Sequence, residues 1–298
     1  MLQAASPPMP ALNTRPGLAL ASVAASLGPL TDLAGTWIGK GFSLVSLPDF
    51  DSRPPSTGPK PFRLKLNSTV EILEVTPIGG AVPNRGSTGQ GDIKIFGLRY
   101  LQRVSDAVTS EALHIEPGFW LRVPSTDVPA GGPTVVRQAS VSHGSSVLAM
   151  GTGLHLTGGP EIGPANSTPV KNPVGTPLTA EYLAPFTDPP LPPGFEPSFV
   201  QNPNLALEEA IRDQDIVHTV ALIISTAAPA SGLGGGIVNM PFDIANANAT
   251  RLDASFWIET VKQADGTTFQ QLQYTQTVIL NFLGVNWPHI SVATLIKQ

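Results

Sequence analysis

Residues 254–283 read ASFWIETVKQADGTTFQQLQYTQTVILNFL, and this stretch decides the fold class. Two runs rich in β-branched and aromatic residues flank the tetrapeptide ADGT at 264–267. Asp-Gly is a preferred pair for the two-residue type I′ turn that joins antiparallel strands. The stretch therefore predicts a β-hairpin with strands over 254–263 and 268–283.

Similar runs recur along the rest of the chain at short spacing. They either alternate apolar and polar residues or are rich in β-branched residues, as strands are. Besides the hairpin, strands are predicted at 35–47, 62–75, 93–104, 112–123, 134–141, 145–156, 216–226 and 290–297. About ten strands with almost no helix between them predict an all-β fold, and closing the sheet removes its edges. We therefore expect a closed antiparallel up-and-down β-barrel with long loops and little helix.

Two parts of the chain do not follow the strand pattern. Residues 157–203 are dense in proline, and so long a loop in a compact domain is either functional or a flexible insertion. We expect it to fold over the barrel mouth as a lid or to mediate contacts between copies. Residues 1–29 are expected to form an N-terminal arm, which leaves 30–298 as a single domain. Short helical turns are predicted after Thr31 or Asp32 and, with Asn204 as N-cap, over 205–214.

Composition excludes several classes of function. The net charge is −5, only 13% of residues are charged, and no Lys/Arg cluster is present, which argues against a nucleic-acid partner. The chain has no cysteine, so disulfides, thiolate metal sites and a cysteine nucleophile are excluded. No run approaches about 18 apolar residues, so no membrane helix is expected. The first residues lack a basic region and are interrupted by prolines, which argues against a signal peptide and favours a cytoplasmic protein.

Motifs of the common enzyme classes are also missing. The sequence contains no GxSxG, HExxH or phosphate-binding loop motif. The glycine-rich run at 232–236 follows an apolar strand, but no helix-forming pattern comes after it, so a dinucleotide site is not expected.

Four segments, taken in order, resemble the nitrobindin family of haem-binding β-barrels. The first, GTWIGKG at 35–41, is similar to the family's opening GTWxGxG, and LHIEPGFWLR at 113–122 is similar to its MHxExGxxR strand. A looser match is QASVSHGSSVLAMG at 138–151. The last segment begins at Leu272 and runs through WPHISVATL at 287–295, which is similar to the family's closing hairpin. The match spans most of the chain and omits the arm and the insertions at 79–91 and 157–203.

The resemblance implies a haem b cofactor with His289 as the proximal ligand of its iron. Neutral imidazole is a good axial ligand for haem iron. Large aromatic side chains are expected to line the haem slot, and candidates for the distal side are the remaining histidines. The lining candidates are Trp37, Trp287, Phe42 and Phe119, and the distal candidates are His143, His155, His114 and His218. The Glu116 carboxylate is expected to accept structural hydrogen bonds rather than to act as a general acid.

One departure from the family concerns the distal side. Family members carry a GxYPT-like element after the first motif, whereas residues 41–48 here read GFSLVSLP, without Tyr or Thr. The family's distal chemistry is therefore not carried over.

Three functions remain open. A haem barrel would act on or sense small nitrogen and oxygen species such as NO, peroxynitrite or peroxide, in a peroxidase-like or isomerase-like way. A metal-free, lipocalin-like carrier of an apolar small molecule would use the same interior. The third is an interaction protein whose surface loops do the work. The first two functions require a small-molecule ligand or substrate, and the third requires a protein partner. Whether the chain forms a homo-oligomer stays open.

Overall fold

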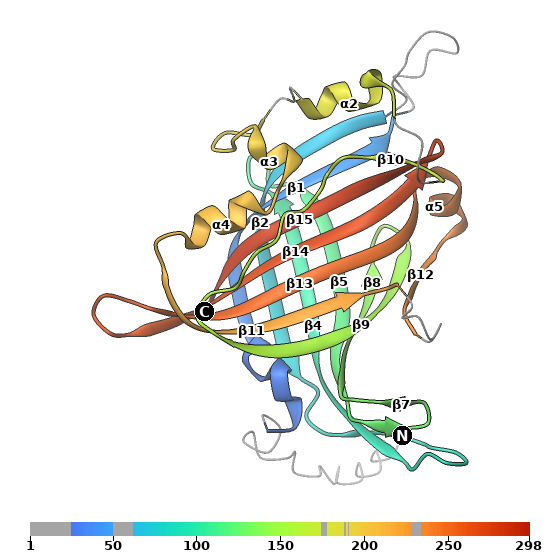
Figure 1. The fold of residues 1–298 in the computed structure, drawn as a ribbon, viewed down its shortest axis with the longest axis vertical. Coiled ribbons are helices and arrows are strands. Elements are labelled where there is room, and N and C mark those ends of the chain that lie inside the picture. The colour runs from blue at the N-terminus through green and yellow to red at the C-terminus, as the bar shows by residue number, and fades with distance from the viewer. Residues whose placement is uncertain (1–24, 50–61, 174–177, 188, 190, 228–233) are drawn as a thin grey trace, which may run out of the picture.

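The fold was obtained as a computed structural model, and it describes residues 25–49, 62–173, 178–187, 189, 191–227 and 234–298. Ten strands form a closed antiparallel barrel, in which the first strand pairs with the last (Figure 1). In their order around the barrel these are β1 (Gly35–Pro48), β2 (Phe62–Pro77), β4 (Ile93–Asp106), β5 (Ala112–Val123), β8 (Thr134–Val141), β9 (Ser145–Thr157), β11 (Asp215–Ser225), β13 (Asn248–Lys262), β14 (Thr268–Phe282) and β15 (Val285–Lys297). The predicted fold class is confirmed.

Shorter elements decorate the barrel. Three small strands extend its sheet, β3 (Val82–Asn84) on β4, β10 (Val170–Lys171) on β15 and β12 (Gly236–Asn239) on β9, while β6 (Thr126–Asp127) and β7 (Ala130–Gly131) pair only with each other. The helices are the 3₁₀ helix η1 (Gly28–Leu33), α2 (Ala180–Thr187), α3 (Ser198–Gln201), α4 (Leu205–Ile211) and α5 (Pro241–Asn246). None of the helices in the described ranges is long and apolar enough to cross a membrane.

The predicted hairpin joins β13 to β14, but its loop is not the two-residue turn expected. Gln263 N–H donates to Thr267 O at 2.8 Å, so three residues, 264–266, form the loop. Gly266 has a φ of 86°, which is the left-handed conformation that such a three-residue loop requires at its last position.

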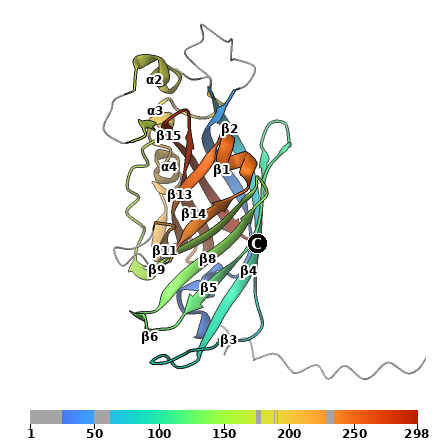
Figure 2. The ribbon, with the colours of Figure 1, turned by 90° about the vertical axis from the view of Figure 1, so that its right-hand side faces the viewer.

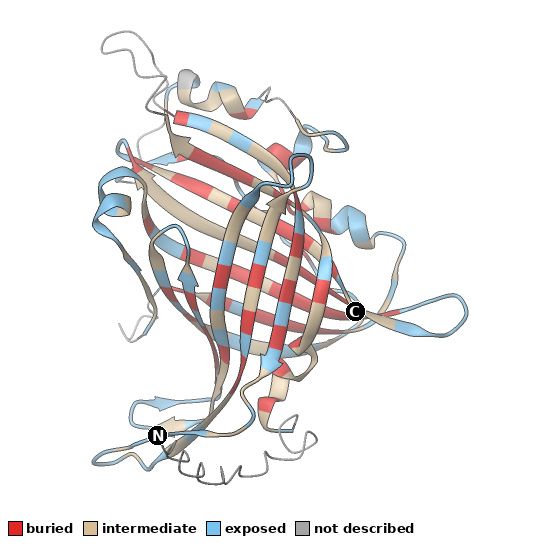
Figure 3. Cartoon of the chain, turned by 180° about the vertical axis from the view of Figure 1, so that it is seen from behind, coloured by how far each residue is buried: buried red, intermediate tan, exposed pale blue. Residues whose placement is uncertain are grey.

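Alternation along the strands gives the barrel a packed interior and an outer surface. In the view from behind, the strands that face the viewer alternate repeatedly between buried and exposed residues (Figure 3). Side chains at every second position form one interior core cluster: Leu73, Leu98, Trp120, Val135, Val220, Phe256, Tyr274, Ala293 and Leu295 among others. In each barrel strand, residues an even number of positions away from these core residues face the interior.

The 3₁₀ helix η1 closes one end of the interior. Leu27, Leu30 and Leu33 are buried in the interior core cluster together with Trp37. Pro29 lies so close to β9 that a Cβ atom on Gly153 would come within 2.5 Å of its ring. We call this the η1 end of the barrel; it lies at the lower part of the molecule in Figures 1 and 2.

The segment between β9 and β11, residues 158–214, covers part of the outer wall (Figure 2). Its helices bury Phe186, Phe199, Val200 and Leu207 against outward-facing side chains of the barrel. We call it the covering segment, and it includes the proline-rich insertion predicted at 157–203. The proline-rich stretch is thus not a plain loop: it contains β10, α2 and α3, and its described helices pack along the wall.

The predicted cap at Thr31 or Asp32 is wrong, because the N-cap of η1 is Leu27. Thr31 lies inside η1, where its hydroxyl donates to Gly28 O at 2.7 Å, and Asp32 lies inside η1 as well. Asn204 is the N-cap residue of α4, as predicted, but its side chain makes no capping hydrogen bond, and its Nδ2 donates to Gly163 O at 2.7 Å instead. Most of the predicted arm 1–29 lies outside the described residues, and the domain boundary stays a prediction.

Candidate functional site

His289 lies on the interior side of β15, near the end opposite η1. Ala293 and Leu295 on the same strand belong to the interior core cluster, and His289 is an even number of residues away from both. Because side chains two residues apart in a strand face the same side, the His289 side chain points into the barrel. The residue keeps part of its surface accessible, and no residue in the described ranges forms a hydrogen bond with its ring. Desolvation, with smaller contributions from His114 and His143, lowers the pKa of His289 to about 4. At neutral pH its imidazole is therefore uncharged.

Two further histidines come from the opposite wall. In the ring of ten strands, β8 is the fifth neighbour of β15 in either direction, and β5 lies next to β8. His114 is an interior-facing residue of β5, and His143 lies in the turn that joins β8 to β9. Their ring centroids are 5.5 Å apart. His289 thus has two histidines across the interior, and we call this the histidine end of the barrel.

A buried ion pair lies beneath His114. Arg137 Nη2 is 2.5 Å from Glu116 Oε1, and both side chains are only 2% exposed. Tyr100 donates to Glu116 and accepts from Arg137 Nε at 3.0 Å. Burial alone would raise the pKa of Glu116, but the Arg137 charge and hydrogen bonds outweigh it and lower that pKa to about 2. Glu116 is therefore ionised, and it accepts structural hydrogen bonds as expected from the sequence.

The same carboxylate holds His114 in place. His114 Nε2 lies 3.3 Å from Glu116 Oε2. Because an ionised carboxylate is only an acceptor, this contact assigns the ring proton of neutral His114 to Nε2 and leaves Nδ1 as an acceptor. The Glu116 side chain thus sets both the position and the tautomer of His114.

A second polar group lies beside the ion pair. Glu71 Oε2 accepts from Tyr274 Oη at 2.7 Å and from Gln102 Nε2 at 3.1 Å. Burial raises the pKa of Glu71 despite these hydrogen bonds. Sequence reasoning missed this residue and Arg137. For Arg137 the available signal was parity, because the same face of β8 otherwise carries Val135, Ala139 and Val141. For Glu71 there was no such signal, because its face of β2 also carries Asn67 and Thr69.

The structure brings only one of the four predicted aromatic residues near His289. Trp287 lies two residues away on β15, packed against Phe62 with ring centroids 4.3 Å apart, and its Nε1 donates to Phe282 O. Trp37 lies opposite Lys297, eight residues along β15 from His289, or roughly 25 Å at strand rise. It therefore belongs to the η1 end.

The other two aromatic residues point out of the barrel. Phe42 stacks on Phe195 of the covering segment with centroids 4.6 Å apart. Phe119 is 44% exposed on the outer side of β5, next to interior-facing Trp120. Strand alternation is the reason, since neighbouring residues in a strand face opposite sides. Both side chains therefore lie on the outer face of the sheet, whereas His289 faces the interior.

The predicted distal candidates separate into two pairs. His155 and His218 pair with each other, with His155 Nδ1 3.4 Å from His218 Nε2. They lie near the end of β9 and the start of β11, at the η1 end. His155 is twelve positions beyond His143 along β9, or about 40 Å at strand rise. His114 and His143 are therefore the distal candidates that the geometry places opposite His289, whereas His155 and His218 are remote.

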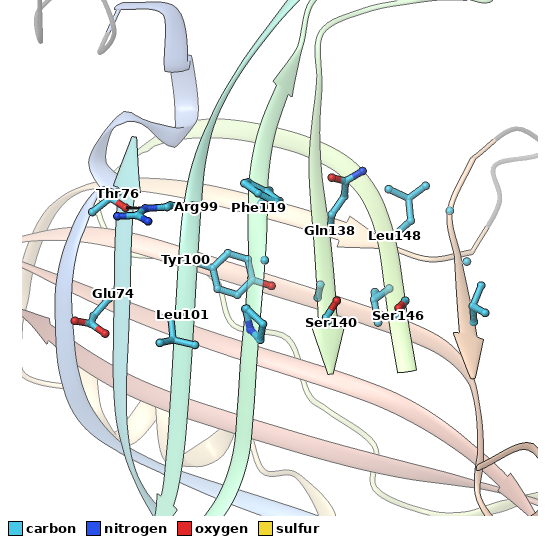
Figure 4. Close-up of a pocket in the computed structure, with 17 residues that line it drawn as sticks. Glu74, Thr76, Arg99, Tyr100, Leu101, Phe119, Gln138, Ser140, Ser146 and Leu148 are labelled. Atoms are coloured by element: carbon cyan, nitrogen blue, oxygen red, sulfur yellow. Dashed lines mark hydrogen bonds between the residues drawn. The ribbon is translucent and has the colours of Figure 1, made fainter. Parts of the chain in front are cut away.

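A groove of about 970 Å³ lies on the outer surface of the wall formed by β4, β5, β8 and β9. Phe119, Gln138 and Leu148 extend from these strands along it, and Arg99 donates to Thr76 Oγ1 at its edge (Figure 4). None of the five histidines lines this groove. The groove and the histidine end are thus separate features.

The described residues contain no group of three or more His, Cys, Asp or Glu side chains placed to hold a metal ion. A haem iron needs only one axial ligand from the protein, with the porphyrin supplying the others. A single unpaired histidine therefore fits haem better than it fits a metal held by protein ligands alone.

Fold and site together define a closed ten-strand antiparallel barrel with a histidine-bearing, polar end. No protein-family model matches the sequence, and no curated protein matches it. Among solved structures, the chain is similar to the crystal structure of Rv2717c from M. tuberculosis, with 16% identity and a TM-score of 0.43, over 92% of this chain and 97% of that one. Similarity at this level carries no information about ligand or activity.

Proposed function

We propose that this chain binds one haem b at the histidine end of its barrel, with His289 as the axial ligand of the iron. The observation that carries the proposal is the state of His289: it faces the interior, has no hydrogen-bond partner among the described residues and has a pKa of about 4. An axial ligand must offer an unprotonated nitrogen, and this imidazole stays unprotonated well below neutral pH.

The surroundings of His289 also suit a large, mostly apolar group. Interior positions of the neighbouring strands carry Val45 on β1 and Val278 on β14, while Leu280 on β14 packs against the cluster that includes the covering segment. Val278 and Leu280 keep accessible surface, as do the interior-facing Ser43 and Ser291. The side chains at this end of the interior are therefore less completely buried than those at the η1 end.

Bound haem would supply the iron centre for redox or ligand-binding chemistry with small nitrogen and oxygen species. The protein's contribution on the opposite wall is a positioned imidazole. Glu116, fixed by Arg137, accepts a hydrogen bond from His114 Nε2 and so holds this imidazole in place. In this proposal His114 is the polar group on the distal side, where residues 41–48 supply no Tyr or Thr. The proposed activity is peroxidase-like or isomerase-like, or sensing of NO.

The test is a hemin titration of the full chain followed by absorption spectroscopy. We expect a saturable Soret band at one haem per chain in the wild type and loss of it in His289→Ala. Added imidazole should restore the band in the variant, because it can occupy the space of the deleted side chain. His155→Ala is the matched control, since that histidine lies at the η1 end, and its titration should match the wild type.

The outcomes separate the candidate functions. An unchanged band in His289→Ala would move the axial ligand to another histidine. No band in the wild type would overturn haem binding, and the metal-free carrier of an apolar ligand would then be tested with fluorescent fatty-acid probes.

A further inference from the structure

We infer that His155 and His218 form a binding site for a zinc ion, separate from the proposed haem site. The two side chains come from adjacent antiparallel strands and lie on the same face of the sheet. His155 is exposed and His218 is half-buried, so an ion can reach them from solvent. Their nearest ring nitrogens are 3.4 Å apart.

The separation of the two nitrogens selects the kind of ion. Zinc–nitrogen bonds of about 2.0–2.1 Å at a tetrahedral angle place two ligand nitrogens about 3.3 Å apart. Adjacent ligands in a square-planar site, the geometry that Cu²⁺ or Ni²⁺ prefers, would be only about 2.9 Å apart. The observed distance of 3.4 Å therefore matches zinc without movement of either ring.

A direct hydrogen bond explains the pair less well. N–H hydrogen bonds in proteins usually span about 2.7–3.2 Å between heavy atoms, so a contact of 3.4 Å is long for one. The rings are inclined by 33° with centroids 5.5 Å apart, so they are not stacked face to face.

The site would hold the zinc with two protein ligands. No described carboxylate forms an ion pair with either histidine, and no third metal-binding side chain joins them. Water molecules would complete the tetrahedron, so the ion is exchangeable and accessible. The binding is accordingly weaker than in a structural zinc site with four protein ligands.

The two histidines lie where the chain enters and leaves the covering segment, so a bound ion would also affect the structure. The two histidines are 63 positions apart in the sequence and stand on either side of the covering segment, residues 158–214. A zinc ion between them would join the strand that enters this segment to the strand that leaves it. Closing a long loop in this way reduces the freedom of the unfolded chain.

The experiment is a calorimetric titration of zinc chloride into the untagged full chain after treatment with a chelator. We expect one zinc per chain in the wild type and loss of this binding in His155→Ala and, separately, in His218→Ala. Thr157→Ala, a change at the residue that pairs with His218 across the strands, should bind zinc like the wild type. Circular dichroism of each variant checks that the barrel is intact.

Cobalt supplies a second readout that reports geometry directly. Co²⁺ in place of zinc should give the intense visible absorption of a tetrahedral site in the wild type and none in either histidine variant. Absence of zinc binding to the wild type, or retention of it in either variant, would overturn the inference. These results do not depend on whether haem binds, because no haem is added.

Discussion

The two ends of the barrel interior are built from opposite chemistries. At the η1 end, Leu27, Leu30 and Leu33 fill the space between the strands, and Trp37 is completely buried beside them. At the histidine end, His289 and His114 face the interior without being fully buried. Between them lies the Glu116–Arg137 ion pair, which is almost inaccessible to solvent.

The difference bears on how much each end contributes to stability. Apolar burial is the dominant favourable contribution to folding, and the η1 end makes full use of it. Buried charges contribute little net stability even when well paired, so their concentration near the histidine end calls for another explanation. Perturbed pKa values and convergent polar groups cluster at functional sites, and both occur here.

The largest expected effect comes from breaking the ion pair. Arg137→Ala leaves the Glu116 carboxylate buried without its partner, and such a change lowers the free energy of unfolding by about 3–5 kcal/mol. Urea denaturation measures it. The control is Arg103→Ala, because Arg103 pairs with Glu74 where both side chains are 47% exposed, and such pairs contribute at most about 1 kcal/mol. Equal effects of the two changes would contradict a special role for the buried pair.

Next in size is a cavity at the η1 end. Leu30 is fully buried, so Leu30→Ala should lower the free energy of unfolding by about 2–5 kcal/mol. Its hemin titration should nevertheless match that of the wild type, because the change is at the opposite end from His289. Val82→Ala, at a residue that is 47% exposed, should change stability by less than about 0.5 kcal/mol. Lost haem binding in Leu30→Ala would show that the two ends are not independent.

The smallest effect is a pH dependence that comes from His289. Its pKa is about 4 in the folded protein against 6.5 in the unfolded chain, so between these values the unfolded state binds more protons. Stability is therefore complete above pH 6.5 and is lost as pH falls towards 4, by up to about 3 kcal/mol from this group. His289→Gln should lose that part of the acid sensitivity in urea titrations from pH 7 to 4. Identical pH profiles for the two proteins would contradict a lowered pKa of His289 in the folded protein.

The barrel itself could be predicted from local patterns. Strands such as β4 and β14 show period-two alternation or runs of β-branched residues, and Asp265-Gly266 marks the loop between β13 and β14. The covering segment could not be predicted, because its packing depends on scattered residues such as Phe195 and Phe199, which have no strand or helix period. Its contacts with Phe42 are decided by tertiary structure alone.

The candidate site was predicted in part for the same reason. The interior placement of His289 could be predicted, because it is an even number of residues from the apolar Leu295 in the same strand. Which histidines face it depends on the order of strands around the barrel, and this information is not local. The sequence therefore left His114 and His143 on an equal footing with His155 and His218, although strand order places the two pairs at opposite ends.

Pairing of β1 with β15 has a consequence for the order of events during synthesis. Leu44 near the beginning of the chain lies opposite Ile290 near its end, so the barrel cannot close until the ribosome has released the last strand. His289 belongs to that strand, next to the seam. Until β15 has been made and the seam has formed, a nascent chain has neither a closed wall nor the proposed iron ligand, so cofactor loading would have to wait for that strand.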